Sequence, residues 1–268
     1  MPINAPHFGN ASYEWLCDMA ALLSAQPDQA SFRPHFPLAL EHPESPGIHE
    51  YVEDHEEFVV RLANTAGHRN SASVLIEKMY AWRGYQTDPP ASHDHNRITL
   101  LVFKLGQSVG TVSLNLDSES GLLLDELYKP EADTLRQLGR RLSEVCKFAV
   151  DHVVNSKRLL ATMFHIVFIF AYRIHNCTDF LIEVNPRHVA FYRRMLGFER
   201  WGEERTCARV AAPALLLRLD LDHMCRMIQA FGGRGDGARG ERSLYPYFFS
   251  PAEEKGITRR ILHDPLAM

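Results

Sequence analysis

The sequence lacks several features that would point to particular classes of protein. Its five cysteines form no Cys-x-x-Cys pair and are odd in number, which fits a reducing compartment better than a disulfide framework and offers no zinc-ligand spacing. Neither sign of charge dominates, because 29 Lys and Arg residues stand against 33 Asp and Glu residues. This balance gives no global attraction to nucleic acid or to an anionic membrane surface. We therefore expect no metal site and no nucleic-acid partner.

Apolar runs of membrane length are also missing. The first ten residues, MPINAPHFGN, contain no basic start followed by an apolar run, so no signal peptide is predicted. The longest apolar tract, residues 159–172, is shorter than a membrane span and contains His165, which predicts a buried helix. We expect a cytoplasmic protein without a transmembrane segment.

The composition that is present is that of a globular protein, with 46% hydrophobic and 23% charged residues. Residues 1–55 carry many Pro and His residues, which predicts an N-terminal extension that is loosely packed or partly disordered. Periodic hydrophobicity begins after that and predicts a core domain over residues 56–221. Residues 222–268 contain a glycine-arginine loop and a last, ordered segment, and we expect this C-terminal extension to pack on the core.

Within the core domain, strand-like and helix-like periods alternate. Strands are predicted over residues 57–64, on both sides of a Gly106-Gln107 turn within 97–116, and over 141–150, 179–186, 198–205 and 213–221. Helices are predicted over 71–84, over 130–141 from Pro130, from Asn155 or Ser156 to about His175, and over 187–196, ending at Gly197. This order predicts an α/β (α+β) fold with a mixed sheet and helices on its faces.

One motif in this region is specific. The pattern N-P-x5-Y-x4-G-F, formed by Asn185, Tyr192, Gly197 and Phe198, resembles the last motif of the GNAT acyltransferase superfamily. Together with the stretches GQSVGTVSL, LLLDELY, GRRLSEVCKFAVD and APALLLRLDL, it resembles the long-chain N-acyl tyrosine type of N-acyl amino acid synthase, which is similar to acyl-homoserine lactone synthases. The resemblance covers residues 57–221 and, more weakly, the C-terminal segment LYPYFFSPAEEKGI.

The resemblance implies a fold and a reaction. The fold is a GNAT-like, mostly antiparallel central sheet of about seven strands that is splayed between strands 4 and 5. The reaction moves a long-chain fatty acyl group from an acyl carrier protein thioester to the α-amino group of an amino acid, with no tightly bound cofactor. Ser113 follows Gly-Thr-Val where many relatives carry arginine, and the first predicted helix offers only Glu77, Lys78 and Arg83 where homoserine lactone synthases carry an arginine. Lactone chemistry on S-adenosylmethionine is therefore not implied, and the amino acid stays open.

Glu144 is the first candidate catalytic residue. Strand alternation would place four residues on one face: Leu142, Glu144, Cys146 and Phe148. Burial among apolar neighbours would raise the pKa of Glu144 and make it a better base for an ammonium group. The resemblance also places a glutamate here, beside the acyl thioester. The alternative is a structural ion pair with Arg140, Arg141 or Lys147.

Tyr192 is the second candidate catalytic residue. The resemblance implies that the tyrosine of this motif gives a proton to the departing thiolate. The alternative is a core aromatic residue, since Val189, Tyr192 and Met195 share one helix face.

The acyl donor is assigned to seven residues: Val145, Cys146, Asn155, Ser156, Lys157, Arg158 and Asn185. No glycine occurs between Gly139 and Gly197, so the glycine loop that wraps a pyrophosphate in coenzyme A-using relatives is missing. A helix beginning near residues 155–156 can still hold the one phosphate of a phosphopantetheine on acyl carrier protein. Lys157, Arg158, Arg193 and Arg194 would form the docking patch for that acidic protein, or be solvated surface charges. Asn185 would hold backbone groups open for pantetheine, or cap the following helix.

The amino acid substrate is assigned to Asp94 and Arg97, which lie where relatives border the amine site. A carboxylate for the ammonium and a guanidinium for the carboxylate would suit a zwitterion. His93 and His95 lie beside them without a third metal ligand in the sequence. Two other functions are considered, an acetyltransferase that uses coenzyme A and a non-catalytic module that binds acyl groups or carrier protein.

Overall fold

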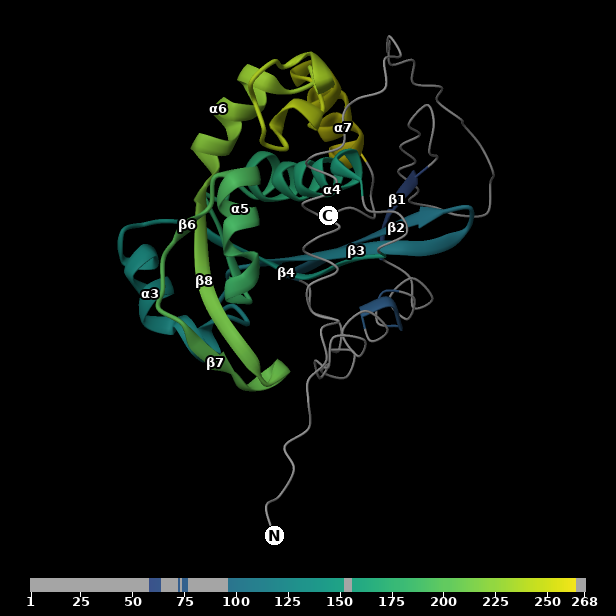
Figure 1. Cartoon of the computed structure of the whole chain (residues 1–268). Helices are drawn as coiled ribbons and strands as arrows, with labels where there is room; N and C mark the ends of the chain where they lie inside the picture. Colours follow the sequence, from purple (N-terminus) through teal and green to yellow (C-terminus); the bar gives the residue numbers. More distant parts are fainter. Residues whose placement is uncertain (1–57, 64–71, 73, 77–95, 152–155, 264–268) are drawn as a thin grey trace.

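The computed structural model describes residues 58–63, 72, 74–76, 96–151 and 156–263 (Figure 1). The predicted N-terminal extension, Asp94 and Asn155 lie outside these residues. Of the helix predicted over residues 71–84, only Ala72 and Val74–Ile76 are described, and they are helical.

The core of the molecule is one sheet of eight strands in the order β1-β2-β3-β4-β5-β8-β6, with β7 also paired to β8. The strands are β1 (Phe58–Leu62), β2 (Arg97–Lys104), β3 (Gln107–Leu116), β4 (Leu142–Val150), β5 (Asp179–Val184), β6 (Glu199–Arg200), β7 (Arg205–Cys207) and β8 (Ala212–Asp220). All pairs are antiparallel except the parallel pair of β4 and β5. The predicted mixed, mostly antiparallel sheet is confirmed. It has eight strands because the run 198–205 forms two short ones.

Helices cover both faces of the sheet. The α-helices are α3 (Asp125–Gln137), α4 (Lys157–Phe168), α5 (Val189–Leu196), α6 (Leu221–Phe231) and α7 (Pro251–His263). A π-helix (Ile169–Ile174) extends α4, and 3-10 turns lie at Pro186–His188, Ala208–Val210, Gly235–Gly237 and Tyr245–Tyr247. Figure 1 shows α3 on one side of the sheet and α4 to α7 on the other. None of the described helices is both long and apolar enough to cross a membrane.

The sheet opens in its middle. The parallel pairing of β4 and β5 comprises only Leu142 with Asp179, Ser143 with Phe180, and Glu144 with Leu181. Both strands continue beyond Glu144 and Leu181, but no pairing between them continues with them. The predicted splay between strands 4 and 5 is therefore confirmed, and it begins at Glu144.

A β-bulge lies in β4 just beyond that point. The pairing of β3 with β4 shifts register between Thr111 and Ser113, and Lys147 has a φ of 51°. An extra residue in a strand turns the following side chains to the opposite face. Phe148 accordingly stacks on Phe164 of α4, with 5.2 Å between the ring centroids. The prediction that Phe148 shares a face with Glu144 is wrong for this reason.

Helix α3 begins earlier than predicted, at Asp125 instead of Pro130. It consists of two segments joined at Tyr128, whose φ and ψ are −126° and 27°. Proline fits only the first turn of a helix, because it has no N–H and its ring crowds the preceding turn. The Tyr128 side chain is wholly buried, with its hydroxyl 2.8 Å from the carbonyl of Ala214. Packing of this tyrosine against β8 therefore accounts for the first segment.

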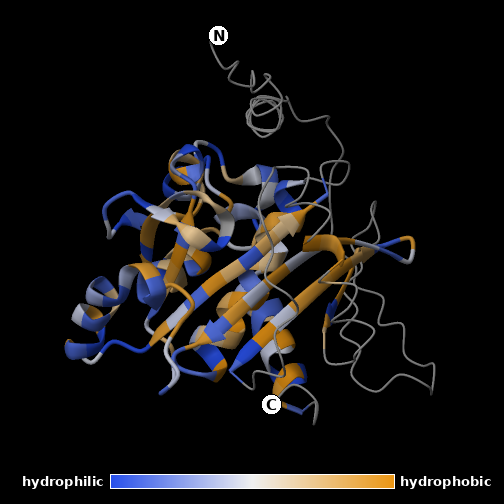
Figure 2. Cartoon of the chain, turned by 90° about the horizontal axis from the view of Figure 1, so that it is seen from below, coloured by the Kyte–Doolittle hydropathy of each residue, from blue (hydrophilic) through white to orange (hydrophobic). Residues whose placement is uncertain are grey.

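The two faces of the sheet form separate cores, and the strands between them are largely apolar (Figure 2). The smaller core packs α3 against Leu142, Leu181 and Leu216. The larger core lies under α4 to α7 and includes Met224, Ile228, Ile257 and Ile261 of the last two helices.

A buried polar cluster ties the C-terminal segment to α4. His165 is fully buried in α4, and its Nδ1 accepts a hydrogen bond of 3.0 Å from the backbone N–H of Phe249. Its Nε2 therefore carries the proton and donates to Glu254 of α7 at 3.0 Å. Arg173 donates to the other oxygen of Glu254 at 2.6 Å. These bonds cross from the helix after β4 to the last helix of the chain.

Candidate active site

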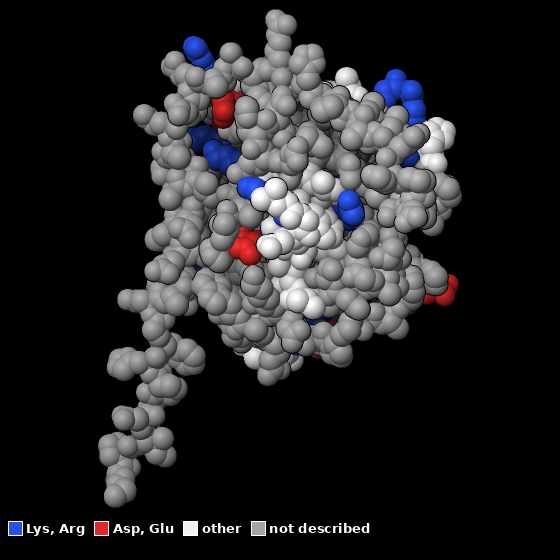
Figure 3. Space-filling model, turned by 90° about the vertical axis from the view of Figure 1, so that its right-hand side faces the viewer, with Lys and Arg blue, Asp and Glu red and all other residues white. Residues whose placement is uncertain are grey.

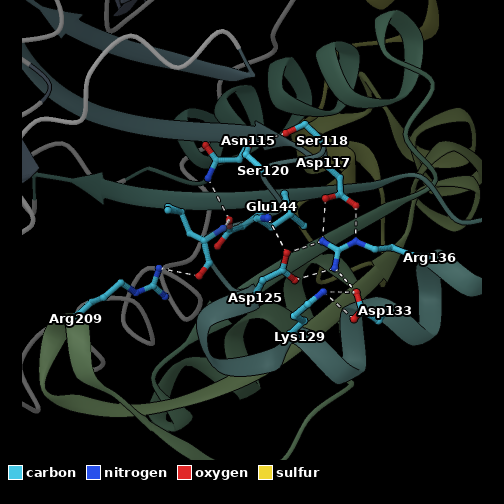
Figure 4. Close-up of polar contacts among 12 residues, drawn as sticks. Asn115, Asp117, Ser118, Ser120, Asp125, Lys129, Asp133, Arg136, Glu144 and Arg209 are labelled. Atoms are coloured by element: carbon cyan, nitrogen blue, oxygen red, sulfur yellow. Dashed lines mark hydrogen bonds and ion pairs between the residues drawn. The ribbon is translucent and has the colours of Figure 1, made fainter.

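Glu144 lies at the point where β4 and β5 separate, on the face that α3 covers. Its side chain is almost wholly buried, at 2% exposed. One oxygen, Oε2, accepts hydrogen bonds from the side-chain amide of Asn115 at 3.1 Å and from the backbone N–H of Leu123 at 2.9 Å (Figure 4). The site therefore contains a buried carboxyl group with defined donors next to an opening in the sheet.

Burial raises the pKa of Glu144 to about 7. The hydrogen bonds from Asn115 and Leu123 and the positive charge of Arg209 oppose this rise, whereas the charge of Glu183 adds to it. Near neutral pH both protonation states of the carboxyl group are populated, which suits a general base. The structural alternative through Arg140 is wrong, because Arg140 pairs with Asp179 and Asp220 at 2.6 and 2.7 Å.

Asn115 connects three functional groups. It is the register partner of Glu144 across β3 and β4. Its Oδ1 accepts a hydrogen bond of 2.8 Å from Nε of Arg97, and its Nδ2 lies 3.1 Å from Glu144 and 3.4 Å from Sγ of Cys146. Burial raises the pKa of the Cys146 thiol to about 12, so the thiol is neutral. The predicted residues Arg97, Glu144 and Cys146 are thus brought together by a residue that the sequence analysis missed.

Arg209 closes the site on the other side. It donates to Glu183 of β5 at 2.8 Å and to the carbonyl of Leu123 at 3.1 Å, and it lies 3.3 Å from Glu126. Figure 4 shows its guanidinium directed toward the cluster around Glu144. The sequence analysis missed Arg209 and Glu183, because only the pairing of β5 and β7 with β8 brings them here.

Tyr192 lies on α5, on the opposite side of the sheet. Its ring makes edge contacts with Phe164 at 6.3 Å and with Phe198 at 5.8 Å between centroids. Burial raises its pKa, so the phenol stays protonated over the physiological range. Among the described residues no hydrogen bond joins the Tyr192 hydroxyl to Glu144. The two residues lie on opposite faces of the sheet, which opens between β4 and β5.

The described residues assigned to the acyl donor lie in β4, in the first turn of α4 and directly after β5. Val145 follows Glu144 in β4 and is buried in the larger core. Ser156 caps α4, with its Oγ accepting from the N–H of Leu159 at 3.1 Å, and Asn185 caps the next turn by accepting from the N–H of Arg187 at 3.2 Å. The predicted helix cap at Ser156 and the capping alternative for Asn185 are confirmed. Binding of pantetheine at these positions stays a prediction.

The predicted basic residues occupy two helices. Lys157 and Arg158 are partly buried in the first turn of α4, and Lys157 lies 5.6 Å from the centre of the Tyr247 ring. Arg193 and Arg194 are exposed on α5. On the side of the molecule in Figure 3 the described Lys, Arg, Asp and Glu side chains are scattered.

The residues described contain no group of three or more His, Cys, Asp or Glu side chains that could hold a metal ion. His93 and His95 lie outside them.

Comparison with known proteins adds to this geometry. A model of the family "N-acyl amino acid synthase FeeM" matches residues 71–220. The chain is similar to the structure of FeeM, an N-acyl amino acid synthase from uncultured soil microbes, with 27% sequence identity and a TM-score of 0.57 over 63% of this chain and 93% of that one. No curated protein sequence matches the chain significantly.

Two further structures are similar to part of the chain at lower scores. One is a putative N-acetyltransferase from Lactobacillus plantarum, with 10% identity and a TM-score of 0.46 over 61% of this chain and 98% of that one. The other is the AHL synthase LasI, with 14% identity and a TM-score of 0.41 over 62% of this chain and 91% of that one.

Proposed function

The chain belongs to the N-acyl amino acid synthase FeeM family and is an N-acyltransferase, and we propose that it moves a long-chain fatty acyl group from an acyl carrier protein thioester to the α-amino group of an amino acid. One observation carries this proposal. Glu144, with a pKa of about 7, lies buried at the point where β4 and β5 part. An amino acid carries an ammonium group at neutral pH, and that group must lose a proton before it can attack a thioester.

In the proposed reaction the amine nitrogen attacks the carbonyl carbon of the thioester. Glu144 takes the proton from the ammonium group, directly or through a water molecule. A C–N bond forms as the C–S bond breaks, and the pantetheine leaves as a thiolate. Tyr192 gives its phenolic proton to the thiolate, and the second proton that the nitrogen loses on becoming an amide restores the phenol. Burial raises the pKa of Tyr192, so the phenol is protonated before the reaction. Arg97 and Asp94 bind the carboxylate and the ammonium of the incoming amino acid.

The donor enters the opening between the strands. Beyond Glu144 the edge of β4 is not paired with β5, so the pantetheine arm can add to it as an extra strand at Val145 and Cys146. Its phosphate would lie at the N-terminus of α4, near Asn155, Ser156, Lys157 and Arg158, with Asn185 across the opening.

Two features favour acyl carrier protein over coenzyme A as the donor. The absence of glycine between Gly139 and Gly197 leaves no loop for a pyrophosphate, whereas phosphopantetheine on a carrier has one phosphate. Carrier proteins are acidic, and the basic residues of α4 and α5 (Lys157, Arg158, Arg193 and Arg194) offer a complementary patch.

Expression of the full chain in a fatty-acid-producing bacterium tests the function. Mass spectrometry of lipid extracts should detect long-chain N-acyl amino acids above the level of cells that express Glu144→Gln. Acetyl transfer from acetyl coenzyme A without long-chain products would overturn the proposal in favour of an acetyltransferase. Neither product would indicate a binding module.

The donor is tested with purified protein. Charge reversal at Lys157 and Arg158 should weaken the use of acyl carrier protein and reduce the salt dependence of the rate, while a short acyl-pantetheine donor is used as before. Reversal of Arg226 and Arg259, which are exposed on α6 and α7, is the matched control. Equal rates for both double variants with the carrier donor would refute the docking patch.

A further inference from the structure

Asn115 is a buried polar residue, 5% exposed, whose hydrogen-bonding groups face the candidate site. Its carbonyl oxygen accepts from Nε of Arg97, and an arginine side chain can only donate. This contact fixes the orientation of the amide, so the NH2 group must point the other way. There it meets Oε2 of Glu144 at 3.1 Å and Sγ of Cys146 at 3.4 Å.

We infer that Asn115 is a positioning residue for the base: oriented by Arg97, it holds Oε2 of Glu144 in place and favours the ionised carboxylate that accepts the substrate proton. The catalytic use of Glu144 rests on the proposed function, but the action of Asn115 on the Glu144 carboxyl does not.

The arrangement explains how a carboxyl group buried this deeply can still ionise. Burial alone would hold Glu144 in its neutral form, which cannot accept a proton. Two donors converge on one oxygen, and a hydrogen bond to a charged acceptor is stronger than one to a neutral acceptor. The Leu123 donor is a backbone N–H and is present with any side chain. Asn115 is therefore the one of these two donors that a substitution can remove.

Other charged and titratable groups face Glu144 from each neighbouring element. Arg97 of β2 acts through Asn115, and Cys146 and Lys147 follow Glu144 in β4. Glu183 of β5 raises the pKa of Glu144, and Arg209 after β7 lowers it. Glu126 of α3 is paired with Arg209. Replacing Asn115 changes none of these other residues, but it removes the contact of Arg97 together with the donor to Glu144. Arg97→Met tests the first of these two losses separately.

The test follows the titration of Glu144 in the full chain. With glutamate labelled by ¹³C at the side-chain carboxyl, the Glu144 resonance is identified by its loss in Glu144→Gln. Asn115→Leu removes the donor, and Asn115→Asp keeps the size of the side chain but places a second carboxylate against Glu144. Both should move the midpoint up by about one pH unit or more. Arg97→Met, which frees the amide to turn, should move it in the same direction.

Thr111→Val is the matched control. Thr111 is a fully buried polar residue of the same strand, and its hydroxyl donates to the carbonyl of Leu100 at 2.9 Å, away from Glu144. The titration midpoint of Glu144 in Thr111→Val should stay at the wild-type value. An unchanged midpoint in Asn115→Asp, or an equal rise in Thr111→Val, would overturn the inference. Asn115→Asp serves where Asn115→Leu does not fold.

Activity gives the second readout. The acidic limb of the kcat/KM profile for N-acyl amino acid formation should move up with the Glu144 midpoint. A uniform loss at every pH with no displacement of the limb would mark Asn115 as structural only and overturn the inference. If the wild-type protein titrates as described but forms no N-acyl amino acid, the proposed function is refuted. The role of Asn115 is then decided by the titration of Glu144 alone.

Discussion

Glu144 lies where the sheet opens, and its buried carboxyl group has a raised pKa that suits a general base. It is the last residue of β4 that pairs with β5, and its carboxyl group is 2% exposed with a pKa raised by burial to about 7. Since only the ionised form accepts a proton, kcat/KM should rise with pH and level off above an acidic limb near pH 7. Glu144→Gln should lower kcat/KM by about 10²- to 10⁴-fold and abolish this limb.

The profile is measured with a saturating acyl donor and a varied amino acid. The fold of Glu144→Gln is checked by circular dichroism, because glutamine has nearly the same size and can accept the same two hydrogen bonds. A wild-type limb near pH 4.5, the ordinary value for glutamate, would contradict the role that burial gives to Glu144.

The same residue should lower the stability of the protein as the pH rises from acidic to neutral. A carboxyl group with a folded-state pKa raised above its unfolded value opposes folding once the unfolded chain ionises, so the free energy of unfolding should fall as pH rises from about 4.5 to 7. Glu144→Gln should remove this loss, which is up to about 3 kcal/mol at 1.36 kcal/mol per pH unit. Urea titrations at pH 4.5 and pH 8 measure this loss. If the free energy of unfolding differs between the wild type and Glu144→Gln by the same amount at both pH values, the prediction is wrong.

Tyr192 offers a comparison on the other side of the opening. Tyr192→Phe keeps the ring that contacts Phe164 and Phe198, so the fold should be retained. Loss of the hydroxyl should lower kcat on the order of 10²-fold, with little change in KM, if the phenol protonates the thiolate. Single-turnover kinetics with an acyl-pantetheine donor separates this step from binding. Unchanged kcat would assign Tyr192 to the core alone.

At the scale of elements, α5 is a short helix whose end is fixed by one residue. Gly197 has a φ of 82°, and its N–H bonds to the carbonyl of Arg193 while the N–H of Phe198 lies 3.4 Å from the carbonyl of Tyr192. A side chain at position 197 would adopt the left-handed conformation at a cost of about 1–2 kcal/mol, and its Cβ would lie 3.1 Å from Nε2 of His223. Gly197→Ala should therefore lower the free energy of unfolding by at least about 1 kcal/mol.

Gly256→Ala provides a control of opposite sign. Gly256 lies within α7, where an added Cβ meets no atom within 4 Å. Alanine there should stabilise the protein by up to about 1 kcal/mol, because it restricts the unfolded chain and favours the helix. Chemical denaturation of both variants measures the two effects, and a neutral Gly197→Ala would contradict the capping role.

At the scale of the whole molecule, local patterns predicted the elements and missed the contacts made by register. Period-two alternation identifies β4 and places Glu144 toward a covered face, because alternation is local. Asn115 lies 29 positions away from Glu144 and becomes its partner only through the pairing of β3 with β4. Phe148 was predicted on the wrong face of β4 because the bulge at Lys147 contains no glycine that would indicate it in the sequence. In both cases the pairing between strands determines which side chains meet. The residues next to each position in the sequence do not indicate that pairing.

The C-terminal helices are joined to the fold by a cluster whose charge depends on pH. Burial lowers the pKa of His165, and the N–H of Phe249 and the carboxylate of Glu254 hold its neutral tautomer. A histidine with a folded-state pKa below its unfolded value of about 6.5 favours the folded state above pH 6.5, and that stability is lost as pH falls below it. The melting temperature of the wild type should therefore decline between pH 6.5 and pH 5.

His165→Leu should melt at a lower temperature at pH 8 and show a flatter decline over the same interval, because leucine does not titrate. Glu254, whose pKa is lowered chiefly by its bond to His165 against the effect of burial, contributes in the same direction only below about pH 4.5. Thermal unfolding in steps of half a pH unit separates the two windows. A wild-type decline confined to pH below 4.5 would assign the effect to the carboxylate, and the histidine would then have no part in docking the last helix against α4.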